Sequence, residues 1–199
     1  TALNADDWSG KSNSNITGTS DLPPIDEQED MILELIPDVK KVGIIYCSSE
    51  PNSIFQARKL EDALKEDNIE FKEYTAADSN EIQSVTTTAA GECDVIYTPT
   101  DNTMASSVET LKNILIPADI PMIAGEEGIC EAGVATLSIS YYSLGLATGK
   151  MAYEVLVNGK DPGTMEIEYA DATNKRYHKE NCEALKIEVP EDYEPIAVD

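Results

Sequence analysis

The apolar run Val-Gly-Ile-Ile-Tyr at residues 42–46, followed by the polar turn Cys-Ser-Ser-Glu-Pro-Asn-Ser at residues 47–53, decides the fold. An uninterrupted apolar run of this length is typical of a strand that is buried on both faces. The turn is rich in helix-capping residue types, and apolar residues then recur at spacings of three and four between Ile54 and Leu64. The segment therefore predicts a strand, a loop and a helix, in that order.

The same unit recurs along the chain. Residues 69–74 alternate in polarity as an edge strand does, and apolar runs predict strands over residues 94–97 and 120–124. The spacing of these strands is that of βαβ units, which form parallel sheets with helices on both faces. The fold class is therefore predicted to be α/β, a parallel sheet flanked by helices on both faces. Helices are predicted over residues 26–36, 54–64, 82–89 and 104–115.

The pattern changes after Gly133. A strand over residues 134–139 and a helix over residues 141–157 are predicted, followed by a short strand over residues 165–169. A short helix over residues 175–185 and an extended acidic tail complete the chain. The helix over residues 141–157 carries apolar residues on two separate stripes, so it needs cover on both sides.

The composition excludes several classes of function. The chain has 199 residues, with 38 acidic side chains against 14 basic ones and a net charge of -24. Such a surface repels phosphate backbones and anionic lipid headgroups, so no nucleic-acid or membrane-surface partner is expected. No apolar run approaches the roughly 20 residues that span a bilayer. An apolar content of 41% predicts a folded, globular chain.

No residue pattern predicts catalysis, a metal site or a cofactor. Two cysteines within a few residues would be needed for a zinc or redox motif, and no such pair occurs. Mostly free thiols are expected, although three disulfide pairings stay open; the cysteines are Cys47, Cys93, Cys130 and Cys182. The single histidine, His178, lies in a polar stretch and is predicted to be a surface residue. The chain has no nucleophile elbow, P-loop or Gly-rich dinucleotide turn.

Small polar residues follow three of the predicted strands. In an open parallel sheet, ligands bind outside the carboxyl ends of the strands, where loops lead into helix N-termini. Hydroxyls, amides and a few carboxylates without a general base suit recognition of a small polar molecule better than turnover. Helix N-termini at residues 50–53 and 102–104 are predicted to offer sites for a ligand carboxylate. An ammonium group would bind Asp101 or Glu126. The candidate ligand-binding residues are Ser48, Asn52, Thr100, Asp101, Asn102 and Glu126.

Five segments bring the chain into register with a known family. They are residues 15–21, 42–53, 97–102, 124–128 and 141–145. With these motifs the chain resembles the substrate-binding proteins of ABC transporters, in the type I periplasmic-binding-like group associated with tryptophan and other aromatic amino acids. The resemblance runs along most of residues 13–190. Ser140 stands where the family often has an acidic residue before the Tyr-Tyr pair, and it joins the candidate ligand-binding residues.

The resemblance implies two α/β lobes joined by three crossovers, with the ligand between them. Two such lobes need on the order of 250–300 residues. We therefore expect this chain to hold the second lobe and part of the first, without the family's initial βα units. The expected parts are residues 1–20 as a crossover and remnant of the first lobe, 21–133 as the second lobe, 134–169 as a segment returning to the first lobe, and 170–199 as a return to the second lobe.

The resemblance also implies a function, location and partners. We expect an extracytoplasmic solute-binding protein, periplasmic or lipid-anchored at the cell surface, that delivers an amino acid or related solute to an ABC permease. A ligand-sensing or regulatory domain of the same fold is the alternative, and an enzyme is a third reading. With part of a lobe absent, the helix over residues 141–157 should expose an apolar face through which the chain could form a homodimer.

Overall fold

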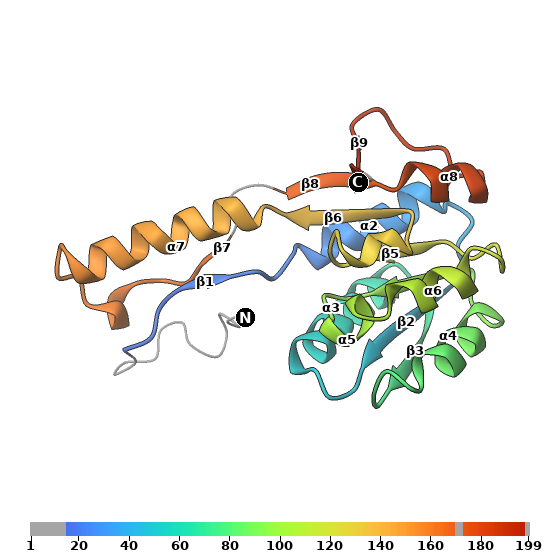
Figure 1. Cartoon of the computed structure of the whole chain (residues 1–199), viewed down its shortest axis with the longest axis horizontal. Helices are drawn as coiled ribbons and strands as arrows, with labels where there is room; N and C mark the ends of the chain where they lie inside the picture. Colours follow the sequence, from blue (N-terminus) through green and yellow to red (C-terminus); the bar gives the residue numbers. More distant parts are fainter. Residues whose placement is uncertain (1–14, 170–172, 198–199) are drawn as a thin grey trace. The chain divides into compact units, whose positions relative to one another are not determined.

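The computed structural model describes residues 15–169 and 173–197. The chain divides into two compact units (Figure 1), each of which is considered by itself. One unit comprises residues 1–23 and 139–174, and the other comprises residues 24–138 and 175–199. Among the described residues, no helix is both long and apolar enough to cross a membrane.

The larger unit is built on a sheet with the strand order β3-β2-β4-β5-β6-β8-β9. The pairs β2–β3, β2–β4, β4–β5 and β5–β6 are parallel, which confirms the predicted parallel sheet, and β3 lies at its edge as its alternating sequence predicted. The strands are β2 (Lys41–Cys47), β3 (Glu70–Ala76), β4 (Val95–Thr98), β5 (Met122–Ala124), β6 (Ala135–Ile139), β8 (Thr173–Tyr177) and β9 (Glu194–Pro195).

Helices cover both faces of this sheet. Helix α2 contacts α3, and α4 contacts α6, so the helices form two neighbouring pairs. Ile45 and Cys47 of β2 belong to the apolar core beneath α4 and α6, whereas Tyr46, between them in sequence, faces the side of α3. The helices are α2 (Ile25–Leu35), α3 (Pro51–Glu66), α4 (Ile82–Ala90), α5 (Asn102–Ala105), α6 (Val108–Leu115) and α8 (Lys179–Leu185).

Three sequence-based predictions need correction. The single helix expected over residues 104–115 is divided into α5 and α6, because Ser106 and Ser107 interrupt it. The helix expected over residues 175–185 begins only at Lys179, since the preceding residues form strand β8. His178 is not a surface residue: it is 4% exposed, and its Nδ1 accepts a hydrogen bond from the Asn181 amide at the start of α8.

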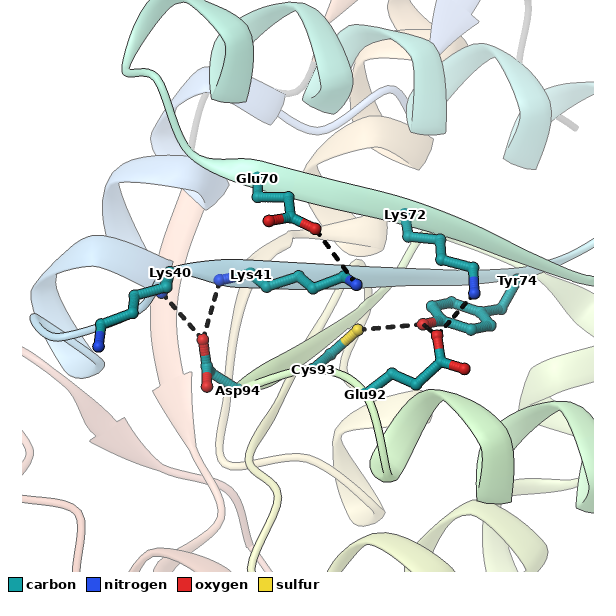
Figure 2. A network of polar contacts seen from close by, with 8 residues as sticks. All are labelled: Lys40, Lys41, Glu70, Lys72, Tyr74, Glu92, Cys93 and Asp94. Atoms are coloured by element: carbon teal, nitrogen blue, oxygen red, sulfur yellow. Dashed lines mark hydrogen bonds and ion pairs between the residues drawn. The ribbon is translucent and has the colours of Figure 1, made fainter.

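A polar network ties together the segments at the amino ends of β2 and β4 (Figure 2). The Asp94 carboxylate accepts hydrogen bonds from the backbone amides of Lys40 and Lys41, over 3.0 and 2.9 Å. The Glu92 carboxylate accepts from the Tyr74 hydroxyl over 2.7 Å and pairs with Lys72. These contacts belong to the end of the strands opposite the candidate ligand loops, and we assign them to stability.

The smaller unit contains helix α7 (Tyr141–Leu156) with strands β1 (Thr19–Ser20) and β7 (Glu168–Tyr169), which pair in parallel beside it (Figure 1). Leu144 and Met151 on one stripe of α7 are buried. On the other side of the helix, Tyr142 and Leu156 are 83% and 82% exposed. The prediction that this helix exposes an apolar face is therefore confirmed. The part of the expected crossover over residues 1–14 lies outside the described residues.

Candidate functional site

The three polar loops singled out in the sequence follow neighbouring strands. Strand β4 pairs with β2 on one side and with β5 on the other, all in parallel. The carboxyl ends of parallel strands meet at one edge of a sheet, so the loops after these strands lie together. The loops comprise residues 48–50, 99–101 and 125–128, and we call them the edge loops.

Side chains at the start of α3 hold the second edge loop by its backbone. Asn52 Nδ2 donates a hydrogen bond to the Thr100 carbonyl over 2.7 Å, and Ser53 Oγ donates to the same oxygen over 3.1 Å. The Thr100 amide in turn donates to Gln56 Oε1 over 3.0 Å. Both backbone polar groups of Thr100 are thus satisfied, and its side chain is left half-buried at the edge.

Glu50 holds the start of α5 and was not among the residues predicted from the sequence. Its two carboxylate oxygens accept four hydrogen bonds, from the amide and side chain of Asn102 and from the amide and hydroxyl of Thr103, over 2.7 to 2.9 Å. Burial opposes ionisation of Glu50, but these hydrogen bonds outweigh it and lower its pKa. Glu50 lies 52 and 53 residues from Asn102 and Thr103 in the sequence, so no local sequence pattern predicts these contacts. The pairing of β2 with β4 brings the two loops together.

Asp101 ends the second edge loop, and its side chain is buried. It is 1% exposed, and its carboxylate accepts hydrogen bonds from the Cys47 amide over 2.7 Å and from the Met104 amide over 2.9 Å. Burial raises the pKa of Asp101, while these hydrogen bonds act in the opposite direction. Asp101 therefore caps α5 and anchors the end of β2, which makes it a positioning residue in this arrangement.

The expected carboxylate site at residues 102–104 needs correction. The amides of Asn102, Thr103 and Met104 already donate to carboxylates of the protein itself. They are consequently not available to a ligand. The first turn of α3 differs, because Pro51 has no N–H and the amides of Asn52 and Ser53 donate to no acceptor among the described residues. Ser53 is fully buried, so only the Asn52 amide belongs to a partly exposed residue.

Gly125 brings the third edge loop against the second. A Cβ atom at this position would lie 2.7 Å from both Pro99 C and Thr100 N, so only glycine permits the approach. The carbonyl of Gly125 accepts a hydrogen bond from the buried side chain of Gln28, which also binds the Leu137 carbonyl and the Tyr97 hydroxyl. This buried network fixes the loop from below.

The remaining predicted residues differ in their surroundings. Ser48 and Asn102 are exposed at the edge, and Glu126 is half-buried beside Gly125. Ser140 belongs to the other unit, where its Oγ accepts a hydrogen bond from the Ser143 amide at the start of α7. The larger unit thus brings together six of the seven candidates.

The described residues offer little that resembles an active centre. No group of three or more His, Cys, Asp or Glu side chains among residues 15–169 and 173–197 could hold a metal ion. All four cysteines are buried free thiols, and burial raises the pKa of Cys93, Cys130 and Cys182. Burial also disfavours the charged form of His178, so it lowers the pKa of this residue, whose side chain caps α8.

Comparison with known proteins gives concordant matches. The sequence profile of the family described as ABC transporter substrate binding protein matches residues 5–197. A tyrosine-binding protein of Clostridioides difficile is 35% identical over 179 residues, which cover 89% of this chain and 52% of that protein. This family and its members are solute-binding proteins, not enzymes.

Solved structures similar to this chain include proteins of the same kind. A Streptococcus pneumoniae ABC domain in complex with L-Trp is 30% identical with a TM-score of 0.82, covering 90% of this chain and 64% of that one. The ligand-free, open structure of a Clostridium difficile substrate-binding protein with adhesive properties is 31% identical with a TM-score of 0.78, covering 95% and 65%. The chain spans about half the length of the curated relative and less than two thirds of these solved chains.

Proposed function

Because this chain belongs to the family of ABC transporter substrate-binding proteins, we propose that it binds an amino acid or a related small polar solute at the edge loops. The observation that carries the proposal is the mutual fixation of these loops, in which Asn52, Glu50 and Gly125 each join one loop to the next. A prearranged edge lowers the entropic cost of binding a small ligand. L-tyrosine and L-tryptophan are the first ligands to test, since one relative is named a tyrosine-binding protein and another was solved in complex with L-Trp.

Each end of an amino acid has a proposed partner. The amide of Asn52, a partly exposed residue in the first turn of α3, suits the ligand carboxylate. The carboxylate of Glu126 suits the ammonium group. Ser48, Thr100 and Asn102 add hydroxyl and amide groups along the edge. The buried carboxylate of Asp101 positions the loop to which it belongs.

Titration calorimetry with L-tyrosine and L-tryptophan tests the proposal. We expect binding of at least one of the two, and we expect Asn52→Ala to weaken it at least tenfold because the α3–Thr100 contact is lost. Asn113→Ala, on the exposed side of α6, is the matched control and should bind as the unmodified chain does. Heat from neither amino acid, or equal loss in both variants, would contradict a site at the edge loops.

The wider role rests on the same family. We propose that the protein works outside the cytoplasm, as a lipoprotein or in the periplasm, and delivers its solute to an ABC permease. We propose also that the larger unit corresponds to one lobe, that the chain leaves this lobe after Ser138, within residues 134–169, and that the ligand is held between two lobes of the whole protein. Ligand-stimulated ATP hydrolysis by the reconstituted transporter tests this role; binding without stimulation would favour the sensing alternative.

A second copy of this chain is the proposed partner for the exposed face of α7. The exposed face of α7 is apolar, and the helix carries only one lysine and one glutamate. Helix α7 therefore has no net negative charge, unlike the chain as a whole, whose charge makes two copies repel each other. Its exposed residues are Tyr142, Leu146, Tyr153, Leu156 and Val157. Sedimentation should show dimers that Leu146→Glu dissociates. A monomer at high concentration would contradict this proposal.

A further inference from the structure

The third edge loop leads directly into the short 3-10 helix η1 (Ile129–Glu131). The backbone of η1 closes on the loop, because the Cys130 amide donates hydrogen bonds to the carbonyls of Glu126 and Glu127 over 3.2 and 3.1 Å. A displacement of the loop weakens these bonds. The Cys130 amide is therefore a reporter of the position of the third edge loop.

The third edge loop is anchored on both sides along the chain. Before it, the Gly125 carbonyl accepts a hydrogen bond from the buried side chain of Gln28. After it, the buried side-chain amide of Asn181 in α8 donates to the carbonyls of Glu131 and Gly133, over 3.0 and 2.7 Å. Between these two anchors, a side chain of β8 contacts the middle of the loop.

That side chain is Arg176, which lies between the loop and the C-terminal tail, residues 190–197. Its Nη2 atom is 3.6 Å from Glu127 Oε1, a distance that makes an ion pair but is too long for a hydrogen bond. The same nitrogen donates a hydrogen bond to the Pro195 carbonyl over 3.3 Å. The side chain of Arg176 is 21% exposed and that of Glu127 is 44% exposed.

The tail, more than the loop, orients the Arg176 guanidinium. Its Nε is buried without a hydrogen-bond partner among the described residues, so Glu127 does not hold it by the two parallel N–H bonds that fix many arginine–carboxylate pairs. The hydrogen bond to Pro195 gives the guanidinium its orientation. The charge that attracts Glu127 is therefore placed by the tail.

The tail is itself seated firmly on the larger unit. Strand β9 pairs in parallel with β8, and the Ile196 amide donates to the Tyr177 carbonyl over 2.9 Å. Tyr193 is 5% exposed, and its hydroxyl donates to Glu34 of α2 over 2.7 Å. Ile196 also packs against the apolar core beneath α4 and α6. The Pro195 carbonyl thus lies between two fixed points.

We propose that Arg176 is a positioning residue of the candidate site, which ties the third edge loop, through Glu127, to the seated C-terminal tail. The proposal rests on the proposed function, since this loop carries Glu126, the proposed partner of the ligand's ammonium group. Arg176 acts on a ligand only through the loop. Because both side chains of the pair are partly exposed, its effect on an equilibrium constant should be about two- to fivefold.

Hydrogen exchange of the ligand-free chain tests the coupling without a ligand. Arg176→Gln and Glu127→Gln should each raise the exchange rate of the Cys130 amide about two- to fivefold, and the double variant should exchange no faster than the single ones, because all three lack the same contact. The Met104 amide, which Asp101 holds in α5, should not change. An unchanged Cys130 amide, equal rises at both amides, or additive effects in the double variant would each overturn the proposal.

Matched variants test the arginine and the tail separately. Glu127→Gln changes a partly exposed side chain, so it decides the question even if Arg176→Gln does not fold. Arg58→Gln removes an exposed arginine from α3 and should leave the Cys130 amide unchanged. Truncation after Asp192 removes Pro195, so it should raise Cys130 exchange as Arg176→Gln does, with no further rise when the two changes are combined. Cys130 exchange that is unaffected by the truncation would contradict the role of the tail.

Titration calorimetry with L-tyrosine and L-tryptophan relates the coupling to binding. Arg176→Gln should weaken binding about two- to fivefold in the otherwise unmodified chain and should have no further effect in the Glu127→Gln chain. A general structural role of Arg176 would weaken binding equally in both backgrounds, and that result would refute the proposal. Binding of neither amino acid to the unmodified chain would contradict the proposed function, whereas the exchange measurements would still decide the role of Arg176.

Discussion

The side-chain amide of Asn52 donates to the backbone carbonyl of Thr100 over 2.7 Å, which joins the first turn of α3 to the loop after β4. Gln56, one turn further along α3, accepts from the amide of the same residue. The edge loops are therefore held by the helix and strands that they connect, and each depends on the others.

Replacing Glu50 should loosen the start of α5. Glu50→Gln puts an NH₂ group among four donors, so we expect a loss of about 1–3 kcal/mol in the free energy of unfolding at pH 7. The pKa of Glu50 is lowered in the folded chain, so its contribution is present above pH 4.5 and is lost as the pH falls through the folded value. Urea unfolding measures this; the exposed Glu66→Gln should leave stability within about 0.5 kcal/mol.

Enlarging Gly125 should displace the second edge loop. The new Cβ of Gly125→Ala would overlap the Pro99 and Thr100 backbone at 2.7 Å, so we expect a cost of about 1–3 kcal/mol and weaker binding of L-tyrosine. Gly149→Ala on α7 is the control. Its Cβ would meet nothing within 4 Å, and alanine should stabilise the helix by about 0.5–1 kcal/mol. Thermal unfolding distinguishes the two, and a neutral Gly125→Ala would count against the close approach.

The buried tyrosine beneath the loops should matter for stability. Tyr97 donates to Gln28 Oε1 over 2.6 Å, and both residues are fully buried. Tyr97→Phe leaves the Gln28 acceptor without that partner, so we expect a loss of about 1–3 kcal/mol. Tyr153→Phe, at a position that is 57% exposed, should change little. Similar urea midpoints for both variants would contradict the role of the Tyr97–Gln28 bond.

The buried histidine should make the chain less stable in acid. Burial lowers the pKa of His178 below 6.5, so the unfolded chain takes up a proton that the folded chain excludes. Its effect is absent above pH 6.5, and stability falls as the pH drops below that value. His178→Asn retains a capping side chain without titrating, so the difference in stability between variant and unmodified chain should shift in the variant's favour between pH 7 and pH 5. An unchanged difference would contradict the assignment.

The sheet could be predicted from the sequence because its signals are local. The apolar run at residues 42–46 and the alternation at residues 69–74 each lie within one strand, and they correctly indicate a central and an edge position. The errors occurred where local signals conflict with tertiary contacts. Residues 175–177 are polar, yet they extend strand β8, and His178 is buried as a cap.

The position of the candidate site could be predicted, but the roles of its residues could not. Strand ends and capping residues indicated the edge loops, since both are local features. Whether a carboxylate faces solvent or a backbone amide depends on contacts between distant residues. The loop after β4 therefore predicts Asp101 as a ligand contact, whereas its carboxylate is buried against backbone amides. No local pattern indicates Glu50, which accepts four hydrogen bonds.

An amide NMR titration of the chain with L-tyrosine and L-tryptophan shows, residue by residue, whether a ligand binds at the edge loops. We expect the largest amide shifts in residues 48–53, 99–103 and 125–128, with the amide of Asn52 among them. The amide of Lys41, held by Asp94 at the other end of β2, should barely move. Shifts confined to the amino ends of the strands or to α4 and α6 would contradict a binding site at the edge loops.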